Sequence, residues 1–207
     1  RTLLTTETII SGIFDGEFQQ ATEATGVLIC SDIILPQNIV TPQANTWSVA
    51  WGDYNNDCYP DLYIANYDSD EANILYKNNG DGTFTETSTA LFGADMASST
   101  VGTWGDYDND GDLDLFIGTR LISGKYTHPA SSYFLINNKG VFKKSNIKNS
   151  KVFKDLGMAT DASFSDIDKD GDEDLIVVGE WMNIKVFENN KGSFKNATKK
   201  YGLDSLS

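Results

Sequence analysis

Positive charge and histidine are scarce in this sequence. Its 207 residues carry 16 lysines and arginines against 30 aspartates and glutamates, and His128 is the only histidine. The shortage of basic residues argues against binding to nucleic acid or to an anionic membrane surface, because both need positive charge in excess. A single histidine, with no nucleophile motif around a serine or cysteine, makes a hydrolytic triad hard to assemble. We therefore expect a protein that is not an enzyme.

Long apolar runs and cysteines are equally few. No stretch of about 18 apolar residues predicts a transmembrane helix, so direct membrane insertion is not expected. The N-terminal residues lack the apolar core of a signal peptide, so either an export signal has been removed or the sequence is a piece of a longer chain. Cys30 and Cys58 are too few for a disulfide scaffold. They either pair in an oxidising compartment or remain buried thiols.

The sequence contains an internal repeat. Three acidic segments of nine residues align, at 53–61 (DYNNDCYPD), 106–114 (DYDNDGDLD) and 166–174 (DIDKDGDED), and their starts are 53 and 60 residues apart. An aromatic residue stands two positions before each segment, and a short apolar run of the kind that forms buried strands follows each one. The aromatics are Trp51, Trp104 and Phe164, and the runs are 62–65, 115–118 and 175–178.

A second signature recurs further along each repeat. An Asn-Asn pair, a glycine and a phenylalanine mark a hairpin turn followed by a strand. The signature occupies 78–84, 137–142 and 189–194, and residues 15–22 match its tail. Four short strands every 50 to 60 residues, with almost no helix signal, predict an all-β fold: a β-propeller segment of four-stranded antiparallel blades.

The repeat also predicts the domain organisation. We assign residues 1–27 to the end of a preceding blade, and residues 28–95, 96–150 and 151–207 to three blades, each with one acidic segment. Since a propeller ring usually has four to eight blades, we expect the remaining blades to come from a longer chain or from another subunit. A four-bladed ring closed by the N-terminal half blade is the alternative.

The acidic segments have the donor pattern of calcium-binding loops. Calcium takes six to eight oxygens at about 2.3–2.6 Å. A loop folded round the ion points positions 1, 3, 5 and 9 inward and offers the backbone carbonyl of position 7. We therefore expect about three calcium ions as cofactors. The predicted ligands are Asp53, Asn55, Asp57, the Tyr59 carbonyl and Asp61; Asp106, Asp108, Asp110, the Asp112 carbonyl and Asp114; and Asp166, Asp168, Asp170, the Asp172 carbonyl and Asp174.

Charge supports this interpretation. The three loops hold fourteen acidic residues and one lysine, and two carboxylates about 5 Å apart repel by roughly 3 kcal/mol at an effective dielectric of about 20. An EF-hand is excluded, because its bidentate glutamate at position 12 is replaced by Ile64, Ile117 and Val177, and magnesium rarely uses a dedicated protein cage. The first loop has Cys58 where glycine permits a left-handed backbone. Either this loop binds calcium more weakly, or a Cys58–Cys30 disulfide helps to hold the loop in its folded conformation.

These loops and strands resemble the FG-GAP or VCBS repeat of integrin α-chain-like propellers. The stretches 118–126, 129–133 and 174–182 also resemble segments typical of the ASPIC/UnbV, cartilage-acidic-protein-like family. The resemblance spans residues 46 to 203 and implies a secreted or cell-surface, acidic, calcium-binding propeller. It supplies no ligand.

We expect a calcium-stabilised extracellular binding or adhesion scaffold that engages a protein or carbohydrate ligand at the cell surface. The alternative is a propeller-based polysaccharide lyase or hydrolase, or its accessory domain. The long connection of the second repeat, with Arg120, Lys125, Tyr126 and His128, either contributes to binding or packs on a neighbouring blade. The four tryptophans either stack on sugars or pack in the core.

Overall fold

The three repeats fold as three antiparallel sheets. The computed structural model describes residues 46–66, 72–87, 97–122, 125–129, 131–145 and 151–204, and within these ranges only Lys151 and Val152 are helical. The predicted all-β, antiparallel class is therefore confirmed. The expected half blade at 1–27 and Cys30 lie outside the described residues. The strands of the first sheet, in spatial order, are β1 (Thr46–Gly52), β2 (Asp61–Asn66), β3 (Ile74–Asn78) and β4 (Phe84–Glu86).

The second sheet has one strand more than expected. The connection after β6 turns back and forms β7, which pairs with the far end of β6. The third sheet returns to four strands. The second sheet runs β5 (Ala97–Gly105), β6 (Asp114–Ile122), β8 (Tyr133–Asn138) and β9 (Val141–Lys144), with β7 (Lys125–Pro129) beside β6; the third runs β10 (Met158–Ser165), β11 (Asp174–Glu180), β12 (Lys185–Glu188) and β13 (Lys195–Asn196).

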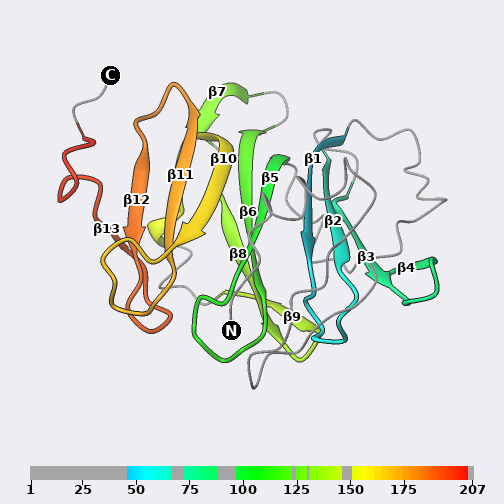
Figure 1. Cartoon of the computed structure of the whole chain (residues 1–207). Coiled ribbons are helices and arrows are strands. Elements are labelled where there is room, and N and C mark those ends of the chain that lie inside the picture. The colour runs from blue at the N-terminus through cyan, green and yellow to red at the C-terminus, as the bar shows by residue number, and fades with distance from the viewer. Residues whose placement is uncertain are drawn as a thin grey trace, which may run out of the picture.

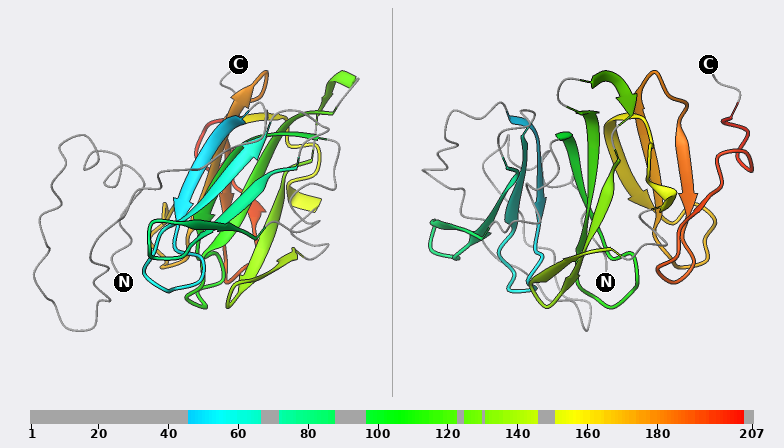
Figure 2. Two further views of the ribbon diagram at one scale, coloured as in Figure 1. Left: turned by 90° about the vertical axis from the view of Figure 1, so that its right-hand side faces the viewer. Right: turned by 180° about the vertical axis from the view of Figure 1, so that it is seen from behind.

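The sheets stand side by side with their first strands adjacent. Strand β5 packs against both β1 and β10, and the three acidic segments leave the sheets at one common end, at the bottom of Figure 1. Strand β7 lies at the opposite end, and the view from behind shows the same order of sheets (Figure 2, right). In the part of the chain that the structure describes, no helix is long and apolar enough to cross a membrane.

The apolar cores lie between neighbouring sheets. Strand β6 serves both, because its side chains alternate between its two faces. Leu115 and Ile117 are fully buried in the cluster with the first sheet, and Phe116 is fully buried in the cluster with the third. The cluster between the second and third sheets is rich in aromatic residues, and the ring centroids of Phe153 and Phe187 lie 4.9 Å apart in it. This packing buries sheet faces that a single sheet would leave exposed.

Glycines on the first strands allow the sheets to approach closely. A Cβ on Gly102 of β5 would lie 2.3 Å from the ring of Tyr63 on β2, and one on Gly52 of β1 would lie 2.7 Å from the ring of Trp104 on β5. Contacts under 3.0 Å force atoms to move, and Tyr63 is fully buried. The sheets can therefore approach this closely only because Gly52 and Gly102 have no Cβ atom.

We expect Gly102→Ala to lower the free energy of unfolding by about 2–3 kcal/mol, because overpacking a tight core displaces the Tyr63 ring. Urea unfolding monitored by tryptophan fluorescence measures it. Ser163→Ala, on the exposed side of β10, is the control and should change stability by less than about 0.5 kcal/mol. Equal effects of the two substitutions would contradict the close-contact argument.

Candidate metal centre

Each acidic segment coils around its own carboxylates. We call residues 53–61, 106–114 and 166–174 loops 1, 2 and 3. The carboxylate at position 1 accepts the backbone N–H groups of positions 5 and 6. In loop 2, Asp106 accepts from Asp110 and Gly111, both at 3.0 Å. The same bonds are 3.0 and 2.9 Å in loop 1, and 3.1 and 3.2 Å in loop 3. The alternating pattern therefore produces one shared loop conformation.

Two positions of every loop have a left-handed backbone. Position 4 has φ between 57° and 64° in all three loops, and position 6 is Gly111 or Gly171 at φ 94° in loops 2 and 3. Cys58 occupies position 6 of loop 1 at φ 72°, a conformation that costs a residue with a Cβ roughly 1–2 kcal/mol. Cys58 is a free, half-buried thiol. The suggested Cys30 bridge involves a residue outside the described ranges.

The aspartate at position 9 connects each loop to the third strand of its sheet. Asp114 is fully buried. Its carboxylate accepts the backbone N–H of Tyr107 at 3.3 Å and that of Asn137, in β8, at 2.7 Å. Asp61 and Asp174 make the same pair of bonds in their own sheets. Position 9 therefore has a structural role in addition to any metal ligation.

The first asparagine of each Asn-Asn pair does more than make a turn. The Asn137 amide donates to the Leu113 carbonyl in its own sheet at 3.0 Å and to the Tyr54 carbonyl in loop 1 at 2.6 Å. The Asn189 amide reaches the Tyr107 carbonyl in loop 2 in the same way, at 2.6 Å. The sequence signal was visible, but this bond between neighbouring sheets was not predicted.

Position 7 also joins neighbouring loops through its side chain. Asp112 accepts the Asn56 amide of loop 1 at 2.8 Å and the backbone N–H of Lys139 at 2.8 Å. Asp172 likewise accepts the Asn109 amide of loop 2 at 2.6 Å. The position-7 carboxylates are thus engaged in holding neighbouring loops together. This agrees with the prediction that position 7 would bind a metal ion through its backbone carbonyl and not through its side chain.

Three of the predicted ligands converge in loops 2 and 3. Carboxylate oxygens of positions 1, 3 and 9 lie within 4.8 Å of one another in each loop. In loop 2, Asp108 Oδ1 is buried and has no hydrogen-bond partner. The aspartate at position 5 of loops 2 and 3 accepts the backbone N–H of position 7 through its Oδ1, at 2.9 Å in both loops. The converging residues are Asp106, Asp108 and Asp114 in loop 2 and Asp166, Asp168 and Asp174 in loop 3.

Loop 1 has a different donor set. Asn55 replaces the position-3 aspartate, and its amide donates to Asp61 at 3.2 Å. Position 5, Asp57, forms an ion pair with Lys77 at 3.2 Å. Asp53 and Asp61 keep the positions of their counterparts, and Tyr59 donates its backbone N–H to Asp57 at 3.0 Å. The predicted ligands of loop 1 are therefore near one another but already have hydrogen-bond donors.

Burial makes ionisation of the position-9 carboxyls costly without a cation. Loss of water raises the pKa of Asp114 to about 8 and that of Asp61 to about 7. Donated backbone N–H groups lower both values, and neighbouring carboxylates raise them further. Burial and the charges of Asp110 and Asp106 also raise the pKa of Asp108. A bound cation would reverse this preference by favouring the ionised forms.

The calcium-free chain should lose stability as pH rises from about 4 to about 8. The folded-state pKa values of Asp61 and Asp114 lie above the ordinary 3.8. Their contribution is therefore fully present below about pH 4 and is lost as pH rises through about 7 and 8. Calcium should widen the melting-temperature difference between bound and free protein over the same range. Thermal melts at pH 5, 6.5 and 8 measure this, with Asp114→Asn as the control that removes the Asp114 contribution and leaves that of Asp61.

The comparisons point to one family of repeats. Residues 53–117 match the family model of the FG-GAP-like repeat, a stretch that runs from loop 1 through loop 2 into β6. FG-GAP repeats are generally extracellular or cell-surface domains of the binding or adhesion type. No curated protein matches the chain. The match supports the FG-GAP part of the resemblance drawn from the sequence, while the ASPIC/UnbV and cartilage-acidic-protein-like part stays a prediction.

Apart from Trp51 and Trp104, which stand just before loops 1 and 2, the other candidate residues lie at the opposite end of the sheets. Arg120 of β6 lies 5.5 Å from the ring centre of Trp47 on β1 and forms an ion pair with Glu180 of β11, so it joins all three sheets. Trp104 packs against the core between the first two sheets. Trp47 is 50% exposed and Trp181 is 86% exposed. Lys125, Tyr126 and His128 belong to β7.

Proposed function

We propose that the chain is a calcium-stabilised, extracellular propeller segment that binds a protein or carbohydrate ligand and is not an enzyme. The observation that carries the calcium part is the carboxylate cluster of loop 2. A buried carboxylate oxygen without a donor, Asp108 Oδ1, is costly unless a cation or a proton meets it. Oxygen-only donors on a flexible loop are what calcium prefers over zinc or magnesium.

The donor atoms of loop 2 are of the type that calcium prefers, because they are all oxygens. Asp106, Asp108 and Asp114 converge from three positions of one turn, and Asp110 together with the Asp112 carbonyl would complete the oxygen set. When bound, calcium would neutralise the repulsion among these groups. The side chains of Asn137 and Asp112 then transmit the order of each loop to its neighbours.

Calcium titration of the chelator-stripped chain by calorimetry tests this part. We expect saturable binding, and Asp108→Asn should weaken it at loop 2. Asp155→Asn, an exposed substitution outside the loops, should leave binding unchanged. Magnesium should compete weakly. Absence of binding at millimolar calcium would overturn the calcium part of the proposal.

The binding role is supported by the FG-GAP match and by the exposed aromatic residues at the end of the sheets opposite the loops. Trp181 follows β11 at φ 56°, an unusual backbone conformation for a bulky residue. Such residues concentrate at functional sites. Binding of the chain to arrays of glycans and of extracellular matrix proteins, in calcium and in chelator, tests this role. Trp181→Ala should reduce binding without changing the calcium titration.

A further inference from the structure

The three loops differ in the residue that faces them from the third strand of their sheets. This residue immediately precedes the asparagine that binds the position-9 aspartate. It is Lys77 in β3, Ile136 in β8 and Glu188 in β12. The equivalent position of the third strand therefore carries a positive side chain in the first sheet, a neutral one in the second and a negative one in the third.

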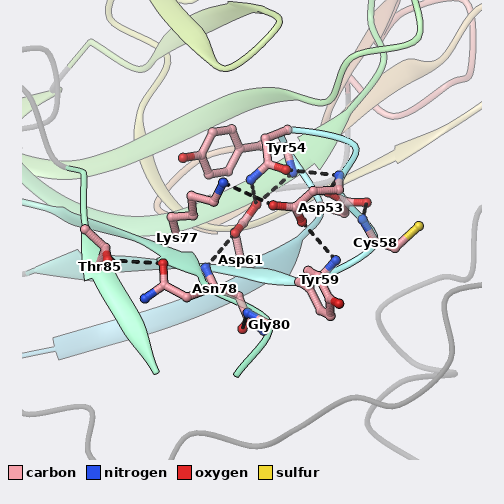
Figure 3. Close-up of polar contacts among 12 residues, drawn as sticks. Asp53, Tyr54, Cys58, Tyr59, Asp61, Lys77, Asn78, Gly80 and Thr85 are labelled. Carbon is pink, nitrogen blue, oxygen red and sulfur yellow. Dashed lines mark hydrogen bonds and ion pairs between the residues drawn. The ribbon is translucent and has the colours of Figure 1, made fainter. Parts of the chain in front are cut away.

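In loop 1 the positive group reaches the carboxylates. The Lys77 ammonium lies 3.2 Å from Asp57 Oδ2. In Figure 3 its side chain extends from β3 into the loop and ends beside Asp61 and Tyr54. The hydrogen bond to Asp57 raises the pKa of Lys77 above its usual value, so the ammonium is charged at neutral pH. The pair is partly exposed and adds little stability alone, but it places a cation within the loop.

The amide of Asn55 supplies the second donor in loop 1. It donates to Asp61 Oδ2 at 3.2 Å while its oxygen accepts the N–H of Asp57 at 3.0 Å. The corresponding Asp108 of loop 2 has a buried oxygen with no donor. The Asn55 amide thus donates to Asp61. The Lys77 ammonium pairs with Asp57. A bound metal ion would otherwise contact both carboxylates.

Loops 2 and 3 do not have this arrangement. Ile136 brings no charge and packs against the core between the second and third sheets. Glu188 adds a carboxylate beside loop 3 and pairs with the Lys200 ammonium, which lies at 3.8 Å from Asp168 Oδ2. Lys200 therefore also pairs with a loop residue, as Lys77 does in loop 1. Loop 3 nevertheless keeps Asp168 at position 3, where loop 1 has the Asn55 amide, so only loop 1 has both donors.

We propose that the Lys77 ammonium and the Asn55 amide take the place of the metal ion in loop 1, so that the chain binds two calcium ions where its sequence repeat predicts three. This inference rests on the proposed function. It assigns the first loop as a metal-independent copy of the other two, held by an internal cation.

Calcium stoichiometry of the full chain tests the inference, measured by equilibrium dialysis with elemental analysis. We expect two ions per chain, unchanged in Asp57→Ala. The double variant Asn55→Asp, Lys77→Ile gives loop 1 the position-3 and third-strand residues of loop 2, and should bind three. Asp57→Ala should lower the melting temperature equally with and without calcium, whereas Asp110→Ala should lower it mainly in calcium.

The outcomes separate the two proposals. Three ions in the natural chain, falling to two in Asp57→Ala, would overturn this inference and leave the calcium proposal intact. Two ions in the double variant would also overturn it, because Lys77 and Asn55 would then not be what excludes the third ion. No bound calcium in any variant would overturn the proposed function itself.

Discussion

Removal of calcium should lower the melting temperature by about 5–10 °C for each ion lost. With a dissociation constant of about 10 μM and about 1 mM calcium outside the cell, mass action gives roughly 2.7 kcal/mol per site. For a chain of this length, each kcal/mol shifts the melting temperature by about 2–4 °C. Two sites would supply a large share of the 5–15 kcal/mol that is typical of a folded domain.

Differential scanning calorimetry in calcium and after stripping with a chelator measures this effect. Excess calcium should restore the melting temperature, and magnesium should restore little of it. Asp110→Ala and Asp170→Ala should each remove most of one site's share in calcium and little after chelation. An unchanged melting temperature, with removal of calcium verified, would mean that the acidic loops are stable without ions.

Asn137→Ala should destabilise the fold by about 3 kcal/mol or more. The side chain is almost fully buried and donates to the Tyr54 and Leu113 carbonyls at 2.6 and 3.0 Å. It also accepts the backbone N–H of Gly140 at 2.8 Å. Truncation would leave these groups without their partners inside the protein, and each buried group so left costs about 1–3 kcal/mol. Chemical denaturation measures the loss.

The neighbouring residue provides a matched control for that substitution. Asn138 belongs to the same Asn-Asn pair but is exposed, so Asn138→Ala should change stability by less than about 0.5 kcal/mol. Comparable losses in the two variants would show that the pair acts only through the hairpin turn. The bond across to loop 1 would then contribute nothing measurable.

The local features of this protein could be predicted because they repeat within short windows. Alternating acids in nine residues, followed by an apolar run, indicate both the loop and the strand after it. Burial of Leu115, Phe116 and Ile117 follows from such a run. Cys58 takes the place of the glycine of the other two loops, so a left-handed backbone could be expected there, and its φ is 72° in the structure.

The contacts between sheets could not be predicted in the same way. Asn137 meets Tyr54 across 83 positions, and Asn56 meets Asp112 across 56. Such pairs depend on how the sheets pack against one another, which no local pattern encodes. Lys77 was missed for a related reason: it lies on a neighbouring strand, and only the folded hairpin brings it to Asp57. Strand β7 was not predicted either: it lies in the long connection of the second repeat, and it pairs with β6 only in the folded chain.

A crystal structure grown in millimolar calcium tests the central claim most directly. In loop 2 we predict a density peak surrounded by oxygens of Asp106, Asp108 and Asp114 at about 2.3–2.6 Å, with Asp110 and the Asp112 carbonyl beside it. Loop 3 should show the same peak, and loop 1 should show the Lys77 ammonium. Well-ordered loop 2 carboxylates turned toward solvent, with no peak among them at that calcium concentration, would contradict the account.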